Sequence, residues 1–548
     1  MDCKARSLGL SVGFELRTPS IKKKSTIAMK IKKLFLLATM LLVAGAMSAC
    51  GGDEPTPPAK PETPVQKPDE PETPAEPTPE IVTYSLPDRE IRGVWVATVG
   101  RMDWPKANVE TMQKDEFVKY LDAFEKYNVN AVIMQIRPCA DAFYESPLEP
   151  WSEYLCGSQG RNPGYDVLQW MIEQVHARGM EFHAWMNPYR ISNSASAFAQ
   201  NGAASHPAKQ HPEWTMKYDN LLMYRPARPE VKQLLVDVVD DLITKYDVDG
   251  IHFDDYFYPY PKSGVEIDDA EDYRTYGAEY ATVGDFRRAQ VDDVVERIHN
   301  LLVSKKPGCI FSIAPFGIWR NKASDAVNGS DSNGLQNYDD LYADVRKWCQ
   351  EGWIDLVVPQ LYNSTSNIAM NFTKMCKWWN DNSFKATLAI GHALYRFGVE
   401  AEGAPYQDLN QLNEQFRISR SNSNTRGSFL FNATCFKENK INILSRVAQV
   451  YAEPTLIPVM GPQTEPAPEA VGDITVDGRT LVWKSAPEGM RYAVYRVKPS
   501  STEGVYEAKL MEVTSKNTYT ALLDGSYAVA MLNRDNVQGE LTQPVKIQ

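Results

Sequence analysis

Two adjacent carboxylates follow an apolar run near the middle of the chain, in the segment His252-Phe-Asp254-Asp255-Tyr. If the run is a β-strand, its side chains alternate between two faces, and Asp254 shares a face with His252. Asp255 has the opposite parity, but the backbone can turn at the end of a strand and bring both carboxylates to one opening. Because buried charge is costly unless it is paired or used, we expect these acids to do chemistry.

The same residues also have plain structural interpretations. Asp255 would then only cap the loop that follows, and Asp254 would form an ion pair with Arg137. In the catalytic interpretation, Asp255 is the acid that gives its proton to a leaving oxygen, and Asp254 orients the reacting group.

Other polar and aromatic side chains stand at or near the ends of predicted strands. Amides and histidines can hold hydroxyl groups, and aromatic rings can stack on sugar rings, so this set indicates a neutral substrate rich in hydroxyls. The residues that we predict to bind it are Arg137, His183, Asn187, Tyr189, His252, Tyr256, Trp319, Gln360, Tyr362 and His392.

A second carboxyl group on another strand end is missing. Glycoside hydrolysis ordinarily uses two carboxyl groups about 5 to 10 Å apart. Here the nearest alternatives are the loop residues Asp103, Asp141 and Glu145. This shortage favours a substrate-assisted reaction, in which a 2-acetamido group of the sugar attacks the anomeric carbon, and such a substrate must be an N-acetylhexosamine. A loop acid that completes a conventional pair is the alternative.

Eight strand-like runs, alternating with amphipathic helices, would position these residues. Eight strand-then-helix units give a parallel sheet that closes into a (β/α)8 TIM barrel, with reactive groups at the carboxyl ends of the strands. An open doubly wound sheet is the alternative, but the sequence has no GxGxxG or P-loop motif. The predicted strands are 91–99, 131–138, 181–189, 249–259, 310–319, 354–362, 385–395 and 427–435.

The chain divides into five predicted segments. A signal peptide with a lipobox (1–50) precedes a Pro-rich linker (51–82), and the barrel follows (83–452). A second Pro-rich linker (453–469) leads to short alternating strands at 470–548, which predict a small all-β, fibronectin-III-like sandwich.

The N-terminal segment predicts a membrane anchor. A basic stretch begins at Met29, which makes a better initiator than Met1, and the apolar stretch 34–46 is too short to span a bilayer. Small residues then lead to Cys50, the predicted site of lipidation. Gly51-Gly-Asp-Glu54 resembles the export signal of Bacteroidetes surface lipoproteins. We therefore expect a lipoprotein of the outer membrane, facing the periplasm or the cell surface.

Composition narrows the remaining function classes. The net charge is −12 and no basic stripe lies outside the N-terminus, which argues against nucleic acid as a partner. The cysteines show no CxxC spacing, so we expect no metal and no cofactor. Cys139 and Cys156 lie in one loop region and could pair, whereas several other cysteines are expected to be buried thiols. We expect a monomer.

Five motifs, in order along residues 88–440, resemble the glycosyl-hydrolase-like family ten. This resemblance implies a bacterial barrel, often a lipoprotein, that hydrolyses glycans of the cell envelope, including the peptide-free sugar backbone of peptidoglycan. The motifs are Arg92-Gly-Val-Trp-Val96, Gln135-Ile-Arg-Pro138, His183-Ala-Trp-Met-Asn-Pro188, Asp249-Gly-Ile-His-Phe-Asp-Asp-Tyr256 and Pro359-Gln-Leu-Tyr362.

Two other functions remain open from the sequence. A metal-dependent hydrolase would need His183, His252, Asp254 and His392 to converge, but that class typically has His-x-His on its first strand, where this chain reads Trp95-Val-Ala-Thr98. A surface lipoprotein that binds glycans without cleaving them is the second alternative.

Overall fold

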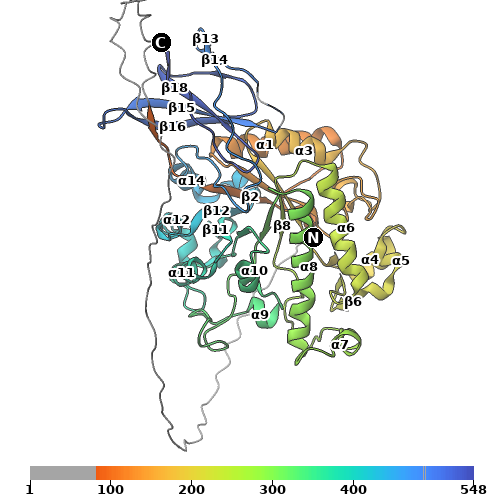
Figure 1. Ribbon diagram of the computed structural model, residues 1–548. Helices are drawn as coiled ribbons and strands as arrows, with labels where there is room; N and C mark the ends of the chain where they lie inside the picture. The colour runs from red at the N-terminus through yellow and green to blue at the C-terminus, as the bar shows by residue number, and fades with distance from the viewer. Residues whose placement is uncertain (1–81, 486, 488) are drawn as a thin grey trace, which may run out of the picture. The chain divides into compact units, whose positions relative to one another are not determined.

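The computed structural model describes residues 82–485, 487 and 489–548. The predicted signal peptide, Cys50 and the 51–82 linker up to residue 81 lie outside the described residues. Eight parallel strands form a closed barrel and follow one another around the ring in chain order (Figure 1). They are β2 (Ile91–Val96), β3 (Ala131–Arg137), β4 (Glu181–Met186), β8 (Gly250–Phe253), β9 (Ile310–Ile313), β10 (Leu356–Val357), β11 (Thr387–Ala393) and β12 (Thr425–Phe431).

A helix follows each barrel strand and packs on the outside of the ring. In Figure 1, α6 and α8 run side by side along the barrel wall. The eight helices are α1 (Glu110–Lys126), α3 (Val167–His176), α6 (Pro229–Lys245), α8 (Val283–Lys305), α10 (Val345–Glu351), α11 (Phe372–Asn382), α12 (Asn410–Ser421) and α14 (Leu444–Val450).

Shorter elements lie in the connections. The short helices are α2 (Glu153–Cys156), α4 (Ala195–Asn201), α5 (Pro207–Gln210), α7 (Ala270–Tyr276), α9 (Asn337–Asp340) and α13 (Thr434–Glu438). The 3-10 turns are η1 (Val99–Arg101), η2 (Pro212–Trp214), η3 (Leu394–Arg396), η4 (Glu400–Glu402), η5 (Ala404–Gln407) and η6 (Lys440–Asn442). Between β4 and α6, a small antiparallel sheet is inserted, with the order β5 (Arg190–Ser192), β7 (Leu221–Tyr224), β6 (Thr215–Tyr218).

Alternation along the strands divides the barrel side chains between two cores. Ile251 and Phe253 join the core between the strands and the helices, as their parity predicts. Trp95, Trp185 and Phe429 fill the barrel interior together with smaller apolar side chains. The interior is therefore a packed core, and a ligand can be received only at its ends.

Two further sheets lie outside the barrel, and all their strands except β1 come after the barrel and pair antiparallel. The predicted fold, a barrel with a small all-β domain, is confirmed. The larger sheet has the order β1-β16-β15-β18-β19, and the first described strand, β1, pairs in parallel with β16. The strands are β1 (Thr83–Ser85), β13 (Thr475–Asp477), β14 (Thr480–Val482), β15 (Arg491–Pro499), β16 (Val505–Thr514), β17 (Thr518–Thr520), β18 (Gly525–Leu532) and β19 (Val545–Ile547).

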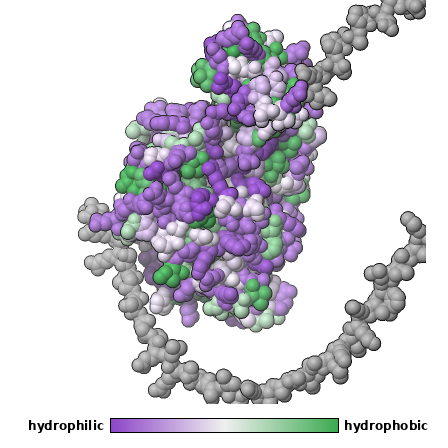
Figure 2. Space-filling view, turned by 90° about the vertical axis from the view of Figure 1, so that its left-hand side faces the viewer, coloured by the Kyte–Doolittle hydropathy of each residue, from purple (hydrophilic) through white to green (hydrophobic). Residues whose placement is uncertain are grey.

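The face of the described chain in Figure 2 is mostly hydrophilic, with small separated hydrophobic patches. Scattered apolar residues of this kind are normal for a protein surface. Among the described residues, no helix is both long enough and apolar enough to cross a membrane.

Candidate functional site

Asp254 stands directly after β8, at the carboxyl end of the barrel, and several donors hold its carboxylate. The indole Nε1 of Trp185 donates to it at 3.1 Å, and Nδ2 of Asn187 donates at 3.0 Å. The backbone N–H of Tyr256 adds a third donor at 3.2 Å. Burial raises the pKa of Asp254, while these donors and the positive charge of Arg190 oppose the rise. The carboxylate is therefore fixed in orientation from three directions.

Asp255 has a different environment, although it is the next residue. The hydroxyl of Tyr260 donates to its carboxylate. The amide of Gln360, which donates to the carbonyl of Ala314 at 2.9 Å, lies close enough to lower the pKa of Asp255. Burial and the negative charge of Asp254 raise the pKa of Asp255 to about 6. Two carboxyl groups whose surroundings differ in this way can take separate roles, one as a proton donor and one as a fixed anion.

Both aspartates are largely buried. Asp254 is 4% exposed and Asp255 is 3% exposed, so they lie at the base of the loops that cover this end of the barrel. Tyr256, by contrast, is 43% exposed, and the guanidinium of Arg190 lies 5.2 Å from the centre of its ring. A cation behind an exposed ring holds that ring in place, which leaves its other face available.

Comparison with known proteins places this arrangement in a family. The model of the family "Glycosyl hydrolase-like 10" matches residues 90–406, a range that contains β2 through β11 and both aspartates. This chain belongs to the glycosyl hydrolase-like 10 family.

Two curated relatives match this chain over most of their own length. Glycosyl hydrolase YngK of Bacillus subtilis (strain 168) is 38% identical over 427 residues, which are 75% of this chain and 83% of that protein. Glycosyl hydrolase DigH of Escherichia coli (strain K12) is 33% identical over 431 residues, 74% of this chain and 94% of that protein.

Among solved structures, the PgaB (BpsB) glycoside hydrolase domain from Bordetella bronchiseptica matches with a TM-score of 0.44 at 10% identity. That match covers 66% of this chain and 98% of that one.

The family match confirms the resemblance that the sequence motifs predict.

Some of the residues that we predicted to bind substrate lie around the two aspartates. Asn187 contacts Asp254, Gln360 contacts Asp255, and Tyr256 is their neighbour in the chain. Tyr362 is half-buried, and its pKa is raised well above the usual value by burial first, with smaller contributions from Tyr395 and Asp255. Tyr189 is buried and lines a cavity beside Tyr256.

One structural interpretation of the sequence was an ion pair between Arg137 and Asp254, and this pair does not form. The guanidinium of Arg137 makes two hydrogen bonds to Glu149, at 2.7 and 2.5 Å, and both side chains are almost fully buried. It also donates to the backbone carbonyls of Asn187 and Pro188. Arg137 therefore supports the loop after β4 and does not face a substrate.

The two histidines of β4 and β8 lie inside the barrel, below the opening. Nε2 of His252 accepts from Trp95 at 3.0 Å, so its Nδ1 carries the proton that bonds to Ser312 at 2.7 Å. His183 bonds to Glu181 at 3.0 Å and packs against Gly250, where a Cβ atom would come within 2.4 Å of the imidazole. Both rings are fully buried, and their hydrogen bonds join them to Trp95, Ser312 and Glu181, not to the aspartates.

His392 and Trp319 also lie away from the opening. His392 points to the helix layer, where it contacts Gln415 of α12 at 3.3 Å and stacks with Phe416. Trp319 is 4% exposed and donates to Asp344 at 2.9 Å. These side chains have structural partners, and the placement gives them no contact with the acids.

The metal-hydrolase alternative loses its geometric basis, because His183, His252 and His392 do not converge on Asp254. Among the residues that the structure describes, no group of three or more His, Cys, Asp or Glu side chains could hold a metal ion.

The loop acids do not supply a second carboxyl group near the pair. Asp103 is fully buried and accepts hydrogen bonds from Ala97 and Thr434. Asp141 is also fully buried, bonded to Gln159, and burial raises its pKa to about 7. Glu145 is exposed, and its carbonyl oxygen accepts from Lys245 of α6 on the outside of the barrel.

The sequence interpretation missed two residues that contact the acids. Trp185 has the parity of His183 on β4, which could have predicted an inward side chain near the strand end. Tyr260 lies in the aromatic run after Asp255, but nothing in that run indicates which ring turns back to the carboxylate.

The possible disulfide between Cys139 and Cys156 does not form. Both are free thiols, and all six described cysteines are buried.

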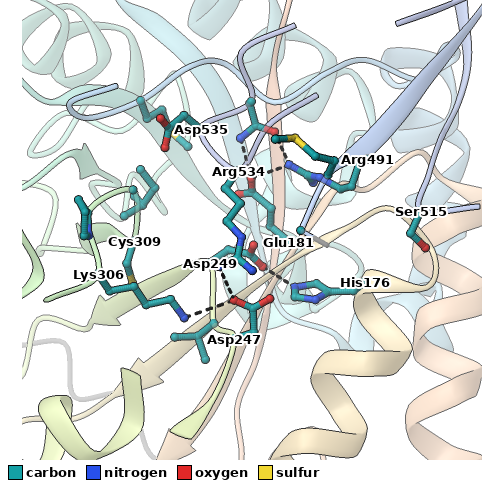
Figure 3. Close-up of a pocket in the computed structure, with 18 residues that line it drawn as sticks. His176, Glu181, Asp247, Asp249, Lys306, Cys309, Arg491, Ser515, Arg534 and Asp535 are labelled. Atoms are coloured by element: carbon teal, nitrogen blue, oxygen red, sulfur yellow. Dashed lines mark hydrogen bonds and ion pairs between the residues drawn. The ribbon is translucent and has the colours of Figure 1, made fainter. Parts of the chain in front are cut away.

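A separate cavity of about 220 Å³ lies at the amino-terminal end of the barrel, against the C-terminal sheets (Figure 3). Residues at the amino-terminal end of such a barrel usually contribute to stability, whereas the active site lies at the carboxyl end. Opposite charges are matched across the cavity, which indicates a contact between the two domains. Two pairs join the sheets to the barrel, Arg534–Asp247 at 3.3 Å and Arg491–Glu181 at 3.8 Å. Two more lie within the barrel, His176–Asp249 at 2.8 Å and Lys306–Asp247 at 3.5 Å.

Proposed function

We propose that this chain is a glycoside hydrolase that cleaves glycan strands containing N-acetylhexosamines, such as the peptide-free backbone of peptidoglycan. The observation that carries the proposal is the pair Asp254–Asp255 at the carboxyl end of β8, with two different environments. Membership of the glycosyl hydrolase-like 10 family and similarity to relatives that are named glycosyl hydrolases support it.

In the proposed reaction, Asp255 gives its proton to the glycosidic oxygen while the C–O bond breaks. The carbonyl oxygen of the 2-acetamido group forms a bond to the anomeric carbon, and Asp254 orients that group through its amide N–H. A water molecule then opens the cyclic intermediate and returns a proton to Asp255. The three donors on Asp254 keep its acceptor oxygens in place, which suits an orienting role.

The acetamido requirement follows from the missing second acid. In the described residues around the pair, the nearest loop acids already have structural partners or face away, so the substrate itself supplies the nucleophile. A conventional two-carboxylate enzyme would need an acid from another strand end.

The low exposure of the two aspartates favours a second candidate function. In that case the protein binds glycans at its aromatic loops and does not cleave them. The substrate experiment below separates the two.

The test is hydrolysis by the purified full chain of peptide-free peptidoglycan strands and chitin oligomers, with de-N-acetylated chitin oligomers as the matched substrate. Mass spectrometry of new reducing ends should show cleavage of the N-acetylated glycans only. Asp255→Asn should lower turnover about a hundredfold or more, the scale of a lost general acid. Asp331→Asn, at an exposed aspartate paired with Lys374, is the matched control.

Three outcomes would count against the proposal. Equal cleavage of the de-N-acetylated glycan would remove the substrate-assisted step. A near-normal rate for Asp255→Asn would remove its assigned role. Binding without new reducing ends, unchanged in the Asn variants, would establish the glycan-binding alternative.

We also propose that the protein is a lipoprotein anchored at Cys50 in the outer membrane, with the Pro-rich segment as a stalk. The sequence pattern around Cys50 supports this. Metabolic labelling with a palmitate analogue, lost in Cys50→Ala, is the expected result.

A further inference from the structure

Two cavities flank the carboxyl end of the barrel. The first has a volume of about 250 Å³ and the second about 320 Å³. These volumes are below or at the lower end of the range of about 300–1,000 Å³ for drug-sized ligands, so each suits about one sugar unit. The first is lined by Tyr189, Arg190, Tyr218, Leu221, Tyr256 and Tyr260, and the second by Met102, Leu394, Tyr395, Val399, Asn432 and Lys440, among others.

The order of the strands places these cavities on opposite sides of the opening. The first is built from the segments after β4 and β8, and the second mainly from the segments after β11 and β12, with Met102 from the segment after β2. In the closed ring β10-β11-β12-β2-β3-β4-β8-β9, β4 is four positions from β11, and β8 is four positions from β12. Four positions in a ring of eight is half the circumference, so the cavities face each other across the barrel.

The acids and a series of aromatic rings lie between the two cavities. The ring of Tyr260, which lines the first cavity, carries the hydroxyl that bonds to Asp255. Tyr362 follows β10, two residues after Gln360, and its ring centre is 6.0 Å from that of Tyr395 in the second cavity. Aromatic faces with a polar edge suit sugar units, which combine apolar C–H faces and hydroxyl groups.

We propose that one glycan chain crosses the barrel opening, with sugar units held in both cavities and the cleaved bond between them, so that the enzyme cuts within the chain. This inference rests on the proposed function and adds its mode of action. An enzyme that removes terminal units would need binding positions on one side of the acids to end at the first sugar, whereas here a cavity lies on either side.

The experiment uses the full chain and an N-acetylated chitin hexamer labelled at its reducing end, with products measured at early times. The wild type should release labelled fragments of intermediate length. Leu221→Trp fills the first cavity and Val399→Trp fills the second, because both positions are partly exposed within them. The two variants should shift the length of the labelled fragment in opposite directions.

Matched controls make the same substitutions at exposed positions outside both cavities. Leu522→Trp and Val327→Trp, at residues 86% and 89% exposed, should leave the product pattern unchanged. If a cavity variant fails to fold, Asn220→Trp in the first cavity and Lys440→Trp in the second provide the same test at other lining positions.

Release of single terminal units by the wild type would overturn this inference and leave the proposed hydrolase intact. Shifts in the same direction, or no shift in folded variants, would overturn it too. If the wild type cleaves no glycan at all, the proposed function fails and the inference fails with it.

Discussion

The indole Nε1 of Trp185 on β4 donates a hydrogen bond of 3.1 Å to the carboxylate of Asp254, which follows the neighbouring strand β8. This bond joins the packed interior of the barrel to the first of the two acids. A substitution at Trp185 therefore tests the orienting role that we propose for Asp254.

Trp185→Phe should lower kcat by about tenfold to a hundredfold with little change in KM. Hydrogen bonds to charged groups contribute about 1.5–3 kcal/mol, and each 1.4 kcal/mol is about tenfold in rate. The measurement is steady-state hydrolysis of the N-acetylated glycan. Trp95→Phe removes a similar buried bond, to His252, away from the acids, and should have a much smaller effect on kcat. Equal losses in both variants would indicate that only barrel packing matters.

The pH dependence of the rate should follow Asp255. Its pKa is raised to about 6 by burial and by Asp254, and it must carry a proton to act as the acid. The rate should therefore fall as the pH rises through about 6. Asp255→Asn should remove this alkaline limb from the residual activity. A rate that is constant from pH 5 to 8 would contradict the assignment.

Tyr260→Phe should shift that limb to higher pH. The hydroxyl of Tyr260 stabilises the ionised form of Asp255 and so lowers its pKa. Without the hydroxyl, Asp255 keeps its proton to a higher pH. Tyr256→Phe removes a hydroxyl from the neighbouring ring and is the control for changes in stacking. A limb that stays in place in Tyr260→Phe would show that the hydrogen bond does not set the titration.

The fold could be predicted from the sequence because the alternation of strands and helices is regular over more than 300 residues of the barrel. The alternation of residues along the strands was less informative about which side chains reach the site. His392 has the parity of Leu388 and Ile390, which face the helices, but position at a strand end was given more weight than parity. Trp319 lies six residues after the end of β9, where alternation no longer applies.

A hydrogen-bond partner from a distant loop explains why Arg137 does not reach the predicted site. Arg137 has the residue type expected at a substrate site, but Glu149, in the loop after β3, accepts hydrogen bonds from Nε and Nη2 along one edge of its guanidinium. No spacing in the sequence links these two residues. The position of the two acids at the carboxyl end of β8 could be predicted from the apolar run before them, whereas their catalytic role stays a prediction.

The pair Arg137–Glu149 should control stability. Glu149→Gln leaves a buried guanidinium without its anion, and breaking a buried pair in this way costs about 3–5 kcal/mol. Urea unfolding should show this loss, whereas Asp331→Asn, in an exposed pair that water screens, should leave the unfolding midpoint nearly unchanged. Normal stability with a raised KM would instead return Arg137 to the substrate site.

Asp103 should hold the first and last strands of the barrel together. Its carboxylate accepts from the N–H of Ala97, just after β2, at 2.7 Å, and from the N–H and hydroxyl of Thr434, just after β12, at 3.0 and 2.6 Å. Asp103→Ala leaves three donors without this acceptor and should lower the free energy of unfolding by about 2–5 kcal/mol.

The pH dependence of this loss has a definite sign. Burial raises the pKa of Asp103 in the folded state to about 6, above its unfolded value, so the folded protein binds the extra proton between about pH 4 and 6. The contribution of Asp103 to stability is therefore greatest below that window and decreases as the pH rises through it. Urea unfolding of wild type and Asp103→Ala should differ more at pH 4 than at pH 7, and a difference that grows with pH would contradict this account.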